Sequence, residues 1–347
     1  MPNIGKIDKN MKSKDFFSLL KFTDVRDTQA KIYGLIKNEY HRLPKEVRQK
    51  CSKSLLYLEN NLSGGRVRFK TNSKRLGIKV WLKNSDLIYN FSYIGFCGID
   101  SYIEKADGSL DFLGVCCPQI YKKKAKAEFS LTGKDEEIIL YLPLYNSIEK
   151  LEIGVDEGAY IKSPKEYEKT KPLVFYGSSI TQGGCASRAG NSYCALVSRW
   201  LKSDFYCYGF SGNAKGEAFL AQYLSQKEMS AFIYDYDFNA PSLAHLKKTH
   251  MLFIKTILEE KPNLPVVMMS KPSAKLSPTD SKRRDFIKKN CEELKNQGYN
   301  TVFIDGETLF SKEIGECCTV DGIHPNDLGF YCMAKRLYPI LKEFTEE

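Results

Sequence analysis

The sequence predicts an α/β protein: a three-layer α/β/α domain with a parallel sheet, preceded by an antiparallel β-sandwich domain of jelly-roll type. Three observations predict this fold class. Short segments of alternating apolar and polar residues fill the first half. Nearly continuous apolar runs alternate with amphipathic stretches in the second half, which is typical of strands covered by helices on both faces. Residues 165–171 are mostly charged or polar and lead into Pro172, which indicates a linker. We therefore expect domains over residues 1–165 and 166–347.

The first domain is expected to consist mainly of strands. Its alternating segments are separated by Gly, Asn, Asp and Ser, which favour turns. The clearest of these segments are residues 65–70, 76–82, 127–131 and 138–142. Helical spacing is scarce here, and we expect only a short helix over residues 16–22 and another around residues 45–58.

The second domain is expected to alternate strands with helices. The apolar runs that predict its strands are residues 173–176, 231–234, 265–269 and 301–304. The stretches with helical spacing are residues 191–202, 243–260, 281–296 and 328–341. A glycine at position 298 follows the third of these and is a common helix stop.

Composition excludes several classes of protein. The chain has 347 residues and a net charge of +10, and its 42% hydrophobic content is too high for a disordered chain. Residues 1–165 hold 29 of the Lys and Arg against 20 of the Asp and Glu, so the excess belongs to the first domain. The basic runs are short and no nucleic-acid module accompanies them, so we expect solvated lysines and no nucleic-acid partner. No window approaches 18 consecutive apolar residues, so no membrane association is expected.

The cysteines predict a reducing compartment. There are 11, an odd number, and two adjacent pairs stand at positions 116–117 and 317–318. Neither a fully paired disulfide framework nor the usual zinc or redox spacing fits this pattern. We therefore expect free thiols, no metal, no cofactor and a cytoplasmic location.

Candidate site residues lie where the strands of the second domain end, because sites in such sheets form at the carboxyl edge. Residues 177–184, GSSITQGG, turn sharply after the first strand and bring a serine to a helix N-terminus. The alternative is that the serine only caps the helix. Residues 209–216 contain three glycines that could expose backbone N–H groups, and residues 235–241 supply two acids and an amide.

The last candidate is the segment Asp321-Gly-Ile-His324-Pro-Asn. A carboxylate three residues before an imidazole can bond one ring nitrogen and leave the other free to act as a base. Of the four histidines, only His324 stands beside an acid in such a loop. His245 and His250 fall within a helical stretch, and His41 lies in the first domain.

Taken together, the blocks resemble the SGNH/GDSL hydrolase superfamily, which carries a serine, a glycine, an asparagine and a histidine in separate blocks. Here these are Ser179, Gly212, Asn239 and His324. The first half also resembles the β-sandwich that precedes the hydrolase in one branch, including a Leu-Pro-Leu-Tyr segment at residues 142–145. Two departures stand out: a serine replaces the usual Asp before the nucleophile, and the third block lacks its usual glycine. Asn213 is therefore an alternative to Asn239.

The resemblance implies a serine esterase. Ser179 would be the nucleophile, His324 the base and Asp321 the residue that orients it, and Ser179, Gly212 and Asn239 would form the oxyanion hole. Arg188 is a candidate substrate-binding residue, or else an ordinary surface arginine. The expected substrate is a small acyl ester or acetylated carbohydrate. The sequence leaves undecided whether the protein forms a homo-oligomer. The alternatives are an acyltransferase, a lipase- or lysophospholipase-type esterase, and a non-catalytic carbohydrate-binding protein.

Overall fold

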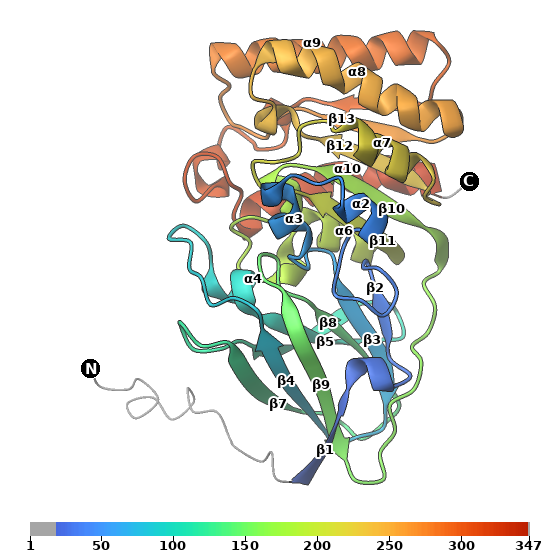
Figure 1. The fold of residues 1–347 in the computed structure, drawn as a ribbon, viewed down its shortest axis with the longest axis vertical. Helices are drawn as coiled ribbons and strands as arrows, with labels where there is room; N and C mark the ends of the chain where they lie inside the picture. The colour runs from blue at the N-terminus through green and yellow to red at the C-terminus, as the bar shows by residue number, and fades with distance from the viewer. Residues whose placement is uncertain (1–18, 346–347) are drawn as a thin grey trace.

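The computed structural model of the protein describes residues 19–345 and contains three β-sheets (Figure 1). Two antiparallel sheets are built from the first half of the chain, and one parallel sheet from the second half. The predicted fold class, an α/β domain with a parallel sheet after an antiparallel β domain, is confirmed. The predicted boundary at residue 165 falls in the segment between the last strand of the first half and the first strand of the second.

The two antiparallel sheets share one hydrophobic core. One sheet has the order β1-β9-β4-β7 and the other β2-β3-β8-β5-β6. Alternate residues of facing strands, such as Ile78, Val80, Ile138 and Leu140, are fully buried in that core. The strands are β1 (Leu20–Asp24), β2 (Lys31–Tyr33), β3 (Arg66–Thr71), β4 (Arg75–Leu82), β5 (Ile99–Glu104), β6 (Leu110–Cys116), β7 (Lys124–Ser130), β8 (Glu136–Tyr141) and β9 (Ile148–Asp156).

The prediction of a helix over residues 16–22 is wrong for the part of that range that the structure describes. Residues 16–18 lie outside the described residues, and Leu20–Asp24 forms β1. This strand pairs antiparallel with β9, with Leu20 opposite Asp156. The sheet ladder overrides the weak local helical spacing, since an edge strand gains its hydrogen bonds from a distant segment.

The parallel sheet has the order β11-β10-β12-β13-β14. Helices α6 and α10 cover one face, and α7, α8 and α9 cover the other (Figure 1). Along β10, Leu173 and Phe175 face the core on the side of α6 and α10, while Val174 and Tyr176 face the core on the side of α7, α8 and α9. The strands are β10 (Lys169–Gly177), β11 (Ser203–Gly209), β12 (Ala231–Asp235), β13 (Val266–Met269) and β14 (Thr301–Ile304). The helices are α6 (Tyr193–Trp200), α7 (Ala218–Ser225), α8 (Leu243–Glu260), α9 (Pro278–Asn296) and α10 (Asp327–Thr345).

Part of the first half packs into the α/β domain. The helix expected around residues 45–58 is two short helices, α2 (Lys45–Arg48) and α3 (Lys53–Glu59), and Ser52 caps the second of them. Their apolar residues join the core beneath α7 and α8. Arg42, 1% exposed, donates to the carbonyls of Cys207 and Gly209 at the end of β11. The two parts of the chain are therefore tied together next to the carboxyl edge of the parallel sheet.

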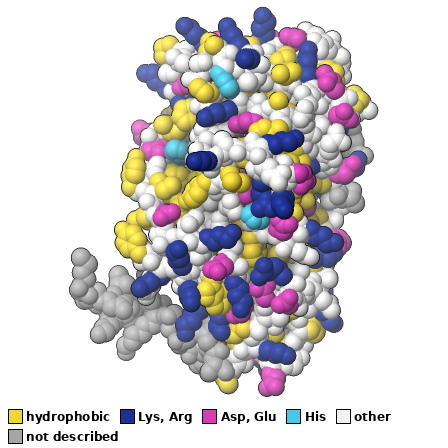
Figure 2. Space-filling view, in the orientation of Figure 1, with side chains coloured by type: hydrophobic (Ala, Val, Ile, Leu, Met, Phe, Trp, Pro, Cys, Tyr) yellow, Lys and Arg dark blue, Asp and Glu magenta, His cyan; other side chains and the backbone are white. Residues whose placement is uncertain are grey.

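Among residues 19–345, no helix combines the length and apolar character that crossing a bilayer requires. On the face shown in Figure 2, Lys and Arg side chains are scattered among acidic and neutral ones.

Candidate active site

Ser179 stands at the sharp turn from β10 into the short helix α5 (Ser179–Gln182). The hydroxyl of Ser178 caps this helix by accepting from the N–H of Ile180 at 3.2 Å. Gly177 makes the turn possible, since a Cβ there would lie 2.1 Å from the carbonyl oxygen of Asp235. Ser178 is therefore the residue that caps the helix, and the hydroxyl of Ser179 is left free to meet another partner.

Ser179, His324 and Asp321 form a chain of hydrogen bonds. Ser179 Oγ lies 2.9 Å from His324 Nε2, and His324 Nδ1 lies 2.8 Å from Asp321 Oδ2. Ser179 and His324 are 145 positions apart in the sequence. They meet because the end of β10 and the loop before α10 lie at the same edge of the sheet. In this arrangement one ring nitrogen is tied to a carboxylate, and the other can take a proton from a hydroxyl.

The carboxylate of Asp321 is held by four donors. Its Oδ1 accepts from the backbone N–H groups of Ile323 at 3.0 Å and His324 at 2.8 Å. Its Oδ2 accepts from the His324 ring and from the side chain of Asn90, the latter at 2.7 Å. Burial by itself would raise the pKa of Asp321, but the hydrogen bonds from His324 and Ile323 lower this pKa to about 2. The group facing the imidazole is therefore a carboxylate at neutral pH.

The residues predicted to form the oxyanion hole lie at three separate places in the fold. The N–H of Ser179 is the first of helix α5, and such an N–H has no partner within its helix. Gly212 is exposed, with a positive φ of 66° and open space where a Cβ would stand. Asn239, just after β12, donates to the carbonyl of Phe210 at 3.0 Å, which fixes its amide against the Gly212 loop. The alternative, Asn213, turns back to the carbonyl of Ser211 in its own loop at 2.9 Å.

With this geometry in view, sequence comparison assigns the chain to a family. Residues 170–342 match the profile of the GDSL-like lipase/acylhydrolase family, and residues 20–161 match that of the N-terminus of SGNH-hydrolase-type esterases. The chain belongs to the GDSL/SGNH hydrolase family. No curated protein shows significant sequence similarity to this chain.

Solved structures share the architecture of this GDSL-family protein over nearly its whole length. A protein described as a GDSL-like lipase from Bacteroides ovatus is 28% identical, with a TM-score of 0.84 over 94% of this chain and 98% of that one. The salicylyl-acyltransferase SsfX3 of a tetracycline biosynthetic pathway is 19% identical, with a TM-score of 0.77 over 93% and 98%. A family two carbohydrate esterase from Cellvibrio japonicus is 13% identical, with a TM-score of 0.60 over 94% and 98%. The last two likenesses concern the fold.

Several residues of this GDSL site were not found from the sequence. Asn90 reaches Asp321 from the loop after β4, and the ring of Phe91 lies 6.0 Å from that of His324. Tyr145 donates to the carbonyl of Ser179 at 3.2 Å. No local pattern marks Asn90 or Phe91, because they act through contacts with a segment more than 200 residues away. Tyr145 carried one signal, its place in the Leu-Pro-Leu-Tyr segment.

The structure does not bring Arg188 together with the triad residues. Its guanidinium lies 3.9 Å from the ring centroid of Phe112 on the sandwich and donates to Asn191 at 3.3 Å. It lines a cavity of about 540 Å³ with Tyr102 and Trp200. Within residues 19–345, no hydrogen bond or ring contact joins it to Ser179 or His324. A role for Arg188 at the substrate therefore stays a prediction.

Two buried acids, Asp235 and Asp237, lie at the end of β12 and just after it. Asp235 is 1% exposed and accepts from Thr181 Oγ1 at 3.0 Å, while its other oxygen has no partner among the described residues. Burial, and then the charge of Asp237, raises the pKa of Asp235 to about 8. Burial likewise raises the pKa of Asp237 to about 6. Asp235 supports the turn at Ser179, since its backbone carbonyl also accepts from the N–H of Ser178 at 2.9 Å. Asp237 accepts instead from the backbone N–H groups of Phe238 and Lys271.

One described cluster has the composition of a metal site. Ligand atoms of Cys185, Asp321 and His324 lie within 4.8 Å of one another. Burial, and then the charge of Asp321, raises the pKa of Cys185 to about 12, and its thiol donates to the carbonyl of Asn90 at 3.2 Å. Both nitrogens of His324 are already hydrogen-bonded. A metal ion needs a deprotonated thiol and a free ring nitrogen, and this cluster offers neither. The cluster therefore fits the hydrogen-bonded chain from Ser179 to Asp321 better than it fits a metal site.

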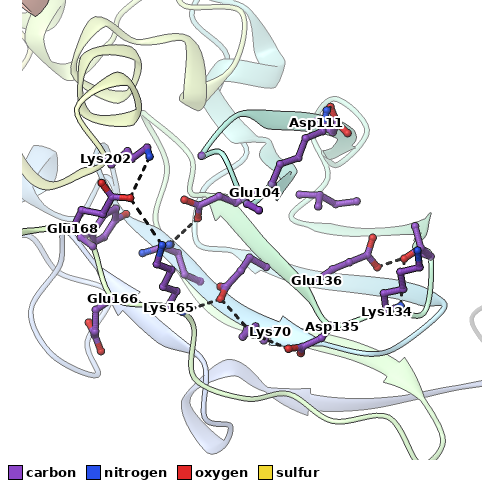
Figure 3. Close-up of a pocket in the computed structure, with 18 residues that line it drawn as sticks. Lys70, Glu104, Asp111, Lys134, Asp135, Glu136, Lys165, Glu166, Glu168 and Lys202 are labelled. Atoms are coloured by element: carbon purple, nitrogen blue, oxygen red, sulfur yellow. Dashed lines mark hydrogen bonds and ion pairs between the residues drawn. The ribbon is translucent and has the colours of Figure 1, made fainter.

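A cavity of about 710 Å³ lies away from these residues, between the sandwich and the segment before β10 (Figure 3). Its side chains are mostly charged, and they pair with one another. Lys70 meets Asp135 at 2.6 Å, and Glu168 meets Lys202 at 3.1 Å. Because these charged side chains already pair with one another, the cavity is better explained as a contact between the two parts of the chain than as a site for a charged ligand.

Proposed function

We propose that the protein is a serine esterase that hydrolyses short acyl esters, above all acetyl esters, carried by a carbohydrate. The observation that carries this proposal is the hydrogen-bonded chain from Ser179 Oγ through His324 to Asp321. Membership of the GDSL/SGNH family supports ester or acyl chemistry in general.

In the proposed mechanism, Ser179 Oγ attacks the ester carbonyl carbon while its proton passes to His324 Nε2. The negative oxygen that forms is bound by the N–H groups of Ser179 and Gly212 and by the side-chain amide of Asn239, each worth about 3–4 kcal/mol in the barrier. The intermediate collapses when His324 protonates the departing alcohol oxygen. A water molecule, activated by the same ring, then attacks the acyl-serine and releases the acid. Asp321 orients the ring and stabilises its charged form in both steps.

The substrate class is proposed from similar folds. Family two carbohydrate esterases from Cellvibrio japonicus and Clostridium thermocellum share the fold of this chain, with TM-scores of 0.60 and 0.58. The salicylyl-acyltransferase shares it as well, and favours the alternative that an alcohol replaces water in the second step. A lipase-type esterase and a carbohydrate-binding protein without turnover are the remaining alternatives.

The test is a panel of p-nitrophenyl acyl esters and acetylated sugars, assayed with wild type and with Ser179→Ala. Turnover is expected with wild type and absent in the variant, which stays folded. The neighbouring Ser178→Ala is the matched control: losing its cap costs about 1 kcal/mol of stability, while most activity remains. Activity that survives Ser179→Ala would show that another group is the nucleophile. Adding glycerol as acceptor and separating the products distinguishes hydrolysis from acyl transfer.

We also propose a cytoplasmic location, because all eleven cysteines are free thiols in the structure. Alkylation of the protein in intact cells should modify exposed Cys317 without prior reduction. A thiol protected until a reductant is added would argue for an oxidising compartment.

A further inference from the structure

A second feature of the site is a cavity of about 440 Å³ beside the Gly212 loop. Its walls come from both halves of the chain. Ser211 and Asn213 of the loop form one side, and Tyr57 and Asn61, from α3 and the residues just after it, form another. A cavity of this size is within the range that holds small molecules and exceeds what an acetyl group needs.

An aromatic wall connects this cavity with the imidazole. Phe96 and Tyr145 line the cavity, and their rings are stacked 5.8 Å apart. The ring of Phe91 lies 4.6 Å from Tyr145 and 6.0 Å from His324. Tyr145 also donates to the carbonyl of Ser179. In ester hydrolysis the imidazole protonates the departing alcohol, so a cavity that shares a wall with the imidazole suits the alcohol part of the ester.

The rim of the cavity exposes apolar side chains to solvent. Tyr57 and Ile88, which line the cavity, are 50% and 37% exposed. Leu87 and Tyr89, the neighbours of Ile88 in the sequence, are 44% and 95% exposed. Figure 2 shows apolar side chains gathered at the left edge of this face, level with α3 and α4 (Tyr93–Cys97) in Figure 1. Clustered apolar exposure beside a cavity marks a binding surface more often than chance. A ligand with an apolar face fits it.

The polar group that stands out in this cavity is Asn61. It is 1% exposed, and neither its Nδ2 nor its Oδ1 has a hydrogen-bond partner among the described residues. The preceding residue differs: Asn60 donates to the carbonyl of Leu56 at 2.7 Å. An amide that is buried without partners is costly and therefore uncommon. Asn61 belongs to the lining of the cavity. Its amide offers a donor and an acceptor together, and a hydroxyl group can use both.

We propose that this cavity holds the alcohol part of the ester and that Asn61 determines specificity by binding a hydroxyl group on a ring with an apolar face. The inference rests on the proposed esterase function. A sugar and a hydroxylated aromatic ring share this chemistry. The aromatic wall and apolar rim contact the face of the ring, while Asn61 donates to and accepts from its hydroxyl.

The test compares substrates that differ by one hydroxyl. Phenyl acetate and 3-hydroxyphenyl acetate provide the aromatic pair, and a monoacetylated methyl glucoside and its monodeoxy analogue provide the sugar pair. In at least one pair, wild type should prefer the hydroxylated ester over its partner by about tenfold in kcat/KM. Asn61→Leu should lose that preference, so that its kcat/KM values for the two esters of the pair lie within about twofold of each other. Asn61→Ser is a second variant in case the first does not fold, and Asn60→Ala is the matched control, expected to keep the preference.

Binding supplies a readout that does not depend on turnover. Resorcinol and methyl glucoside are titrated calorimetrically into Ser179→Ala with and without Asn61→Leu. At least one of them should bind, and Asn61→Leu should weaken it about tenfold. Whether the sugar or the phenol binds identifies the ring.

Three results would overturn the inference. Equal substrate preference in wild type and Asn61→Leu would remove the role of Asn61. A change in preference between acetate and butyrate esters of one phenol, with none between alcohols, would assign the cavity to the acyl group. If neither resorcinol nor methyl glucoside binds in the titrations, the cavity is not a subsite for the alcohol. If wild type hydrolyses no ester at all, the proposed function is wrong. The titrations then decide by themselves whether the cavity binds the alcohol.

Discussion

Replacing Asp321 with Asn tests the orientation of the imidazole most directly. In wild type, Oδ1 accepts from two backbone N–H groups, while Oδ2 faces His324 Nδ1 and the amide of Asn90. In Asp321→Asn, the backbone donors hold the new amide oxygen at the Oδ1 position, because turning it away would leave two N–H groups unpaired, at about 1 kcal/mol each. The new NH₂ group therefore points at Nδ1.

The ring then adopts the other tautomer. Nδ1 becomes the acceptor, so the proton moves to Nε2, the nitrogen 2.9 Å from Ser179 Oγ. A protonated Nε2 cannot take the serine proton. We expect kcat to fall by about 10⁴-fold, as in other enzymes with this arrangement, which is about 5.4 kcal/mol in the barrier.

The assay is hydrolysis of p-nitrophenyl acetate at pH 7.5, with thermal unfolding to show that the variant is folded. The matched control is Asn90→Ala, which removes one bond to the same carboxylate oxygen without reversing the tautomer. It should lower kcat only about fivefold, corresponding to about 1 kcal/mol. A folded Asp321→Asn that loses less than about 30-fold would contradict the reasoning and show that the serine and imidazole work without an orienting acid.

Three further predictions concern stability and reactivity. The raised pKa of Asp235, about 8 in the fold against 3.8 for an exposed Asp, means that unfolding releases a proton between about pH 4 and 8. Wild-type stability should fall as pH rises through that window, and Asp235→Asn should flatten the fall in urea titrations; an unchanged slope would refute a buried neutral acid. Arg42→Met leaves the carbonyls of three residues without their buried donor and should lower the free energy of unfolding by about 3 kcal/mol; a loss below about 1 kcal/mol would contradict this. Iodoacetamide at pH 7.5 should label exposed Cys317 well before Cys185, whose thiol is buried and has a raised pKa; peptide mapping with the reverse order would refute it.

The periodicity of the sequence was enough to predict the fold class. In the second half, fully covered strands read as apolar runs, and β10, β12, β13 and β14 lie where those runs predict them. The strand missed there, β11, lies at the edge of the sheet, where half-exposed residues such as Asp204 and Tyr206 interrupt the run. In the first half, β1 and β9 depend on pairing with each other, which local spacing cannot reveal.

The central site residues could be located because parallel strands end at one edge. A serine after β10 and an acid–histidine pair before α10 were therefore expected to meet, although 145 residues separate them. The residues that were missed, Asn90, Phe91, Tyr145 and Asn61, all come from the first half of the chain. Their roles depend on how that half packs against the α/β domain.

The sequence by itself determined the two kinds of sheet and the residues of the hydrogen-bonded chain, because these follow from side-chain period and from short motifs at strand ends. Only the tertiary structure decided that residues 43–58 belong to the core of the α/β domain, that Asn90 braces Asp321, and that Asn61 lines the neighbouring cavity. It also placed Cys185, six residues after Ser179, in a buried position. The physical reason is the same in each case: these contacts join segments far apart in the chain, and their energies depend on burial and distance, which no local pattern of residues encodes.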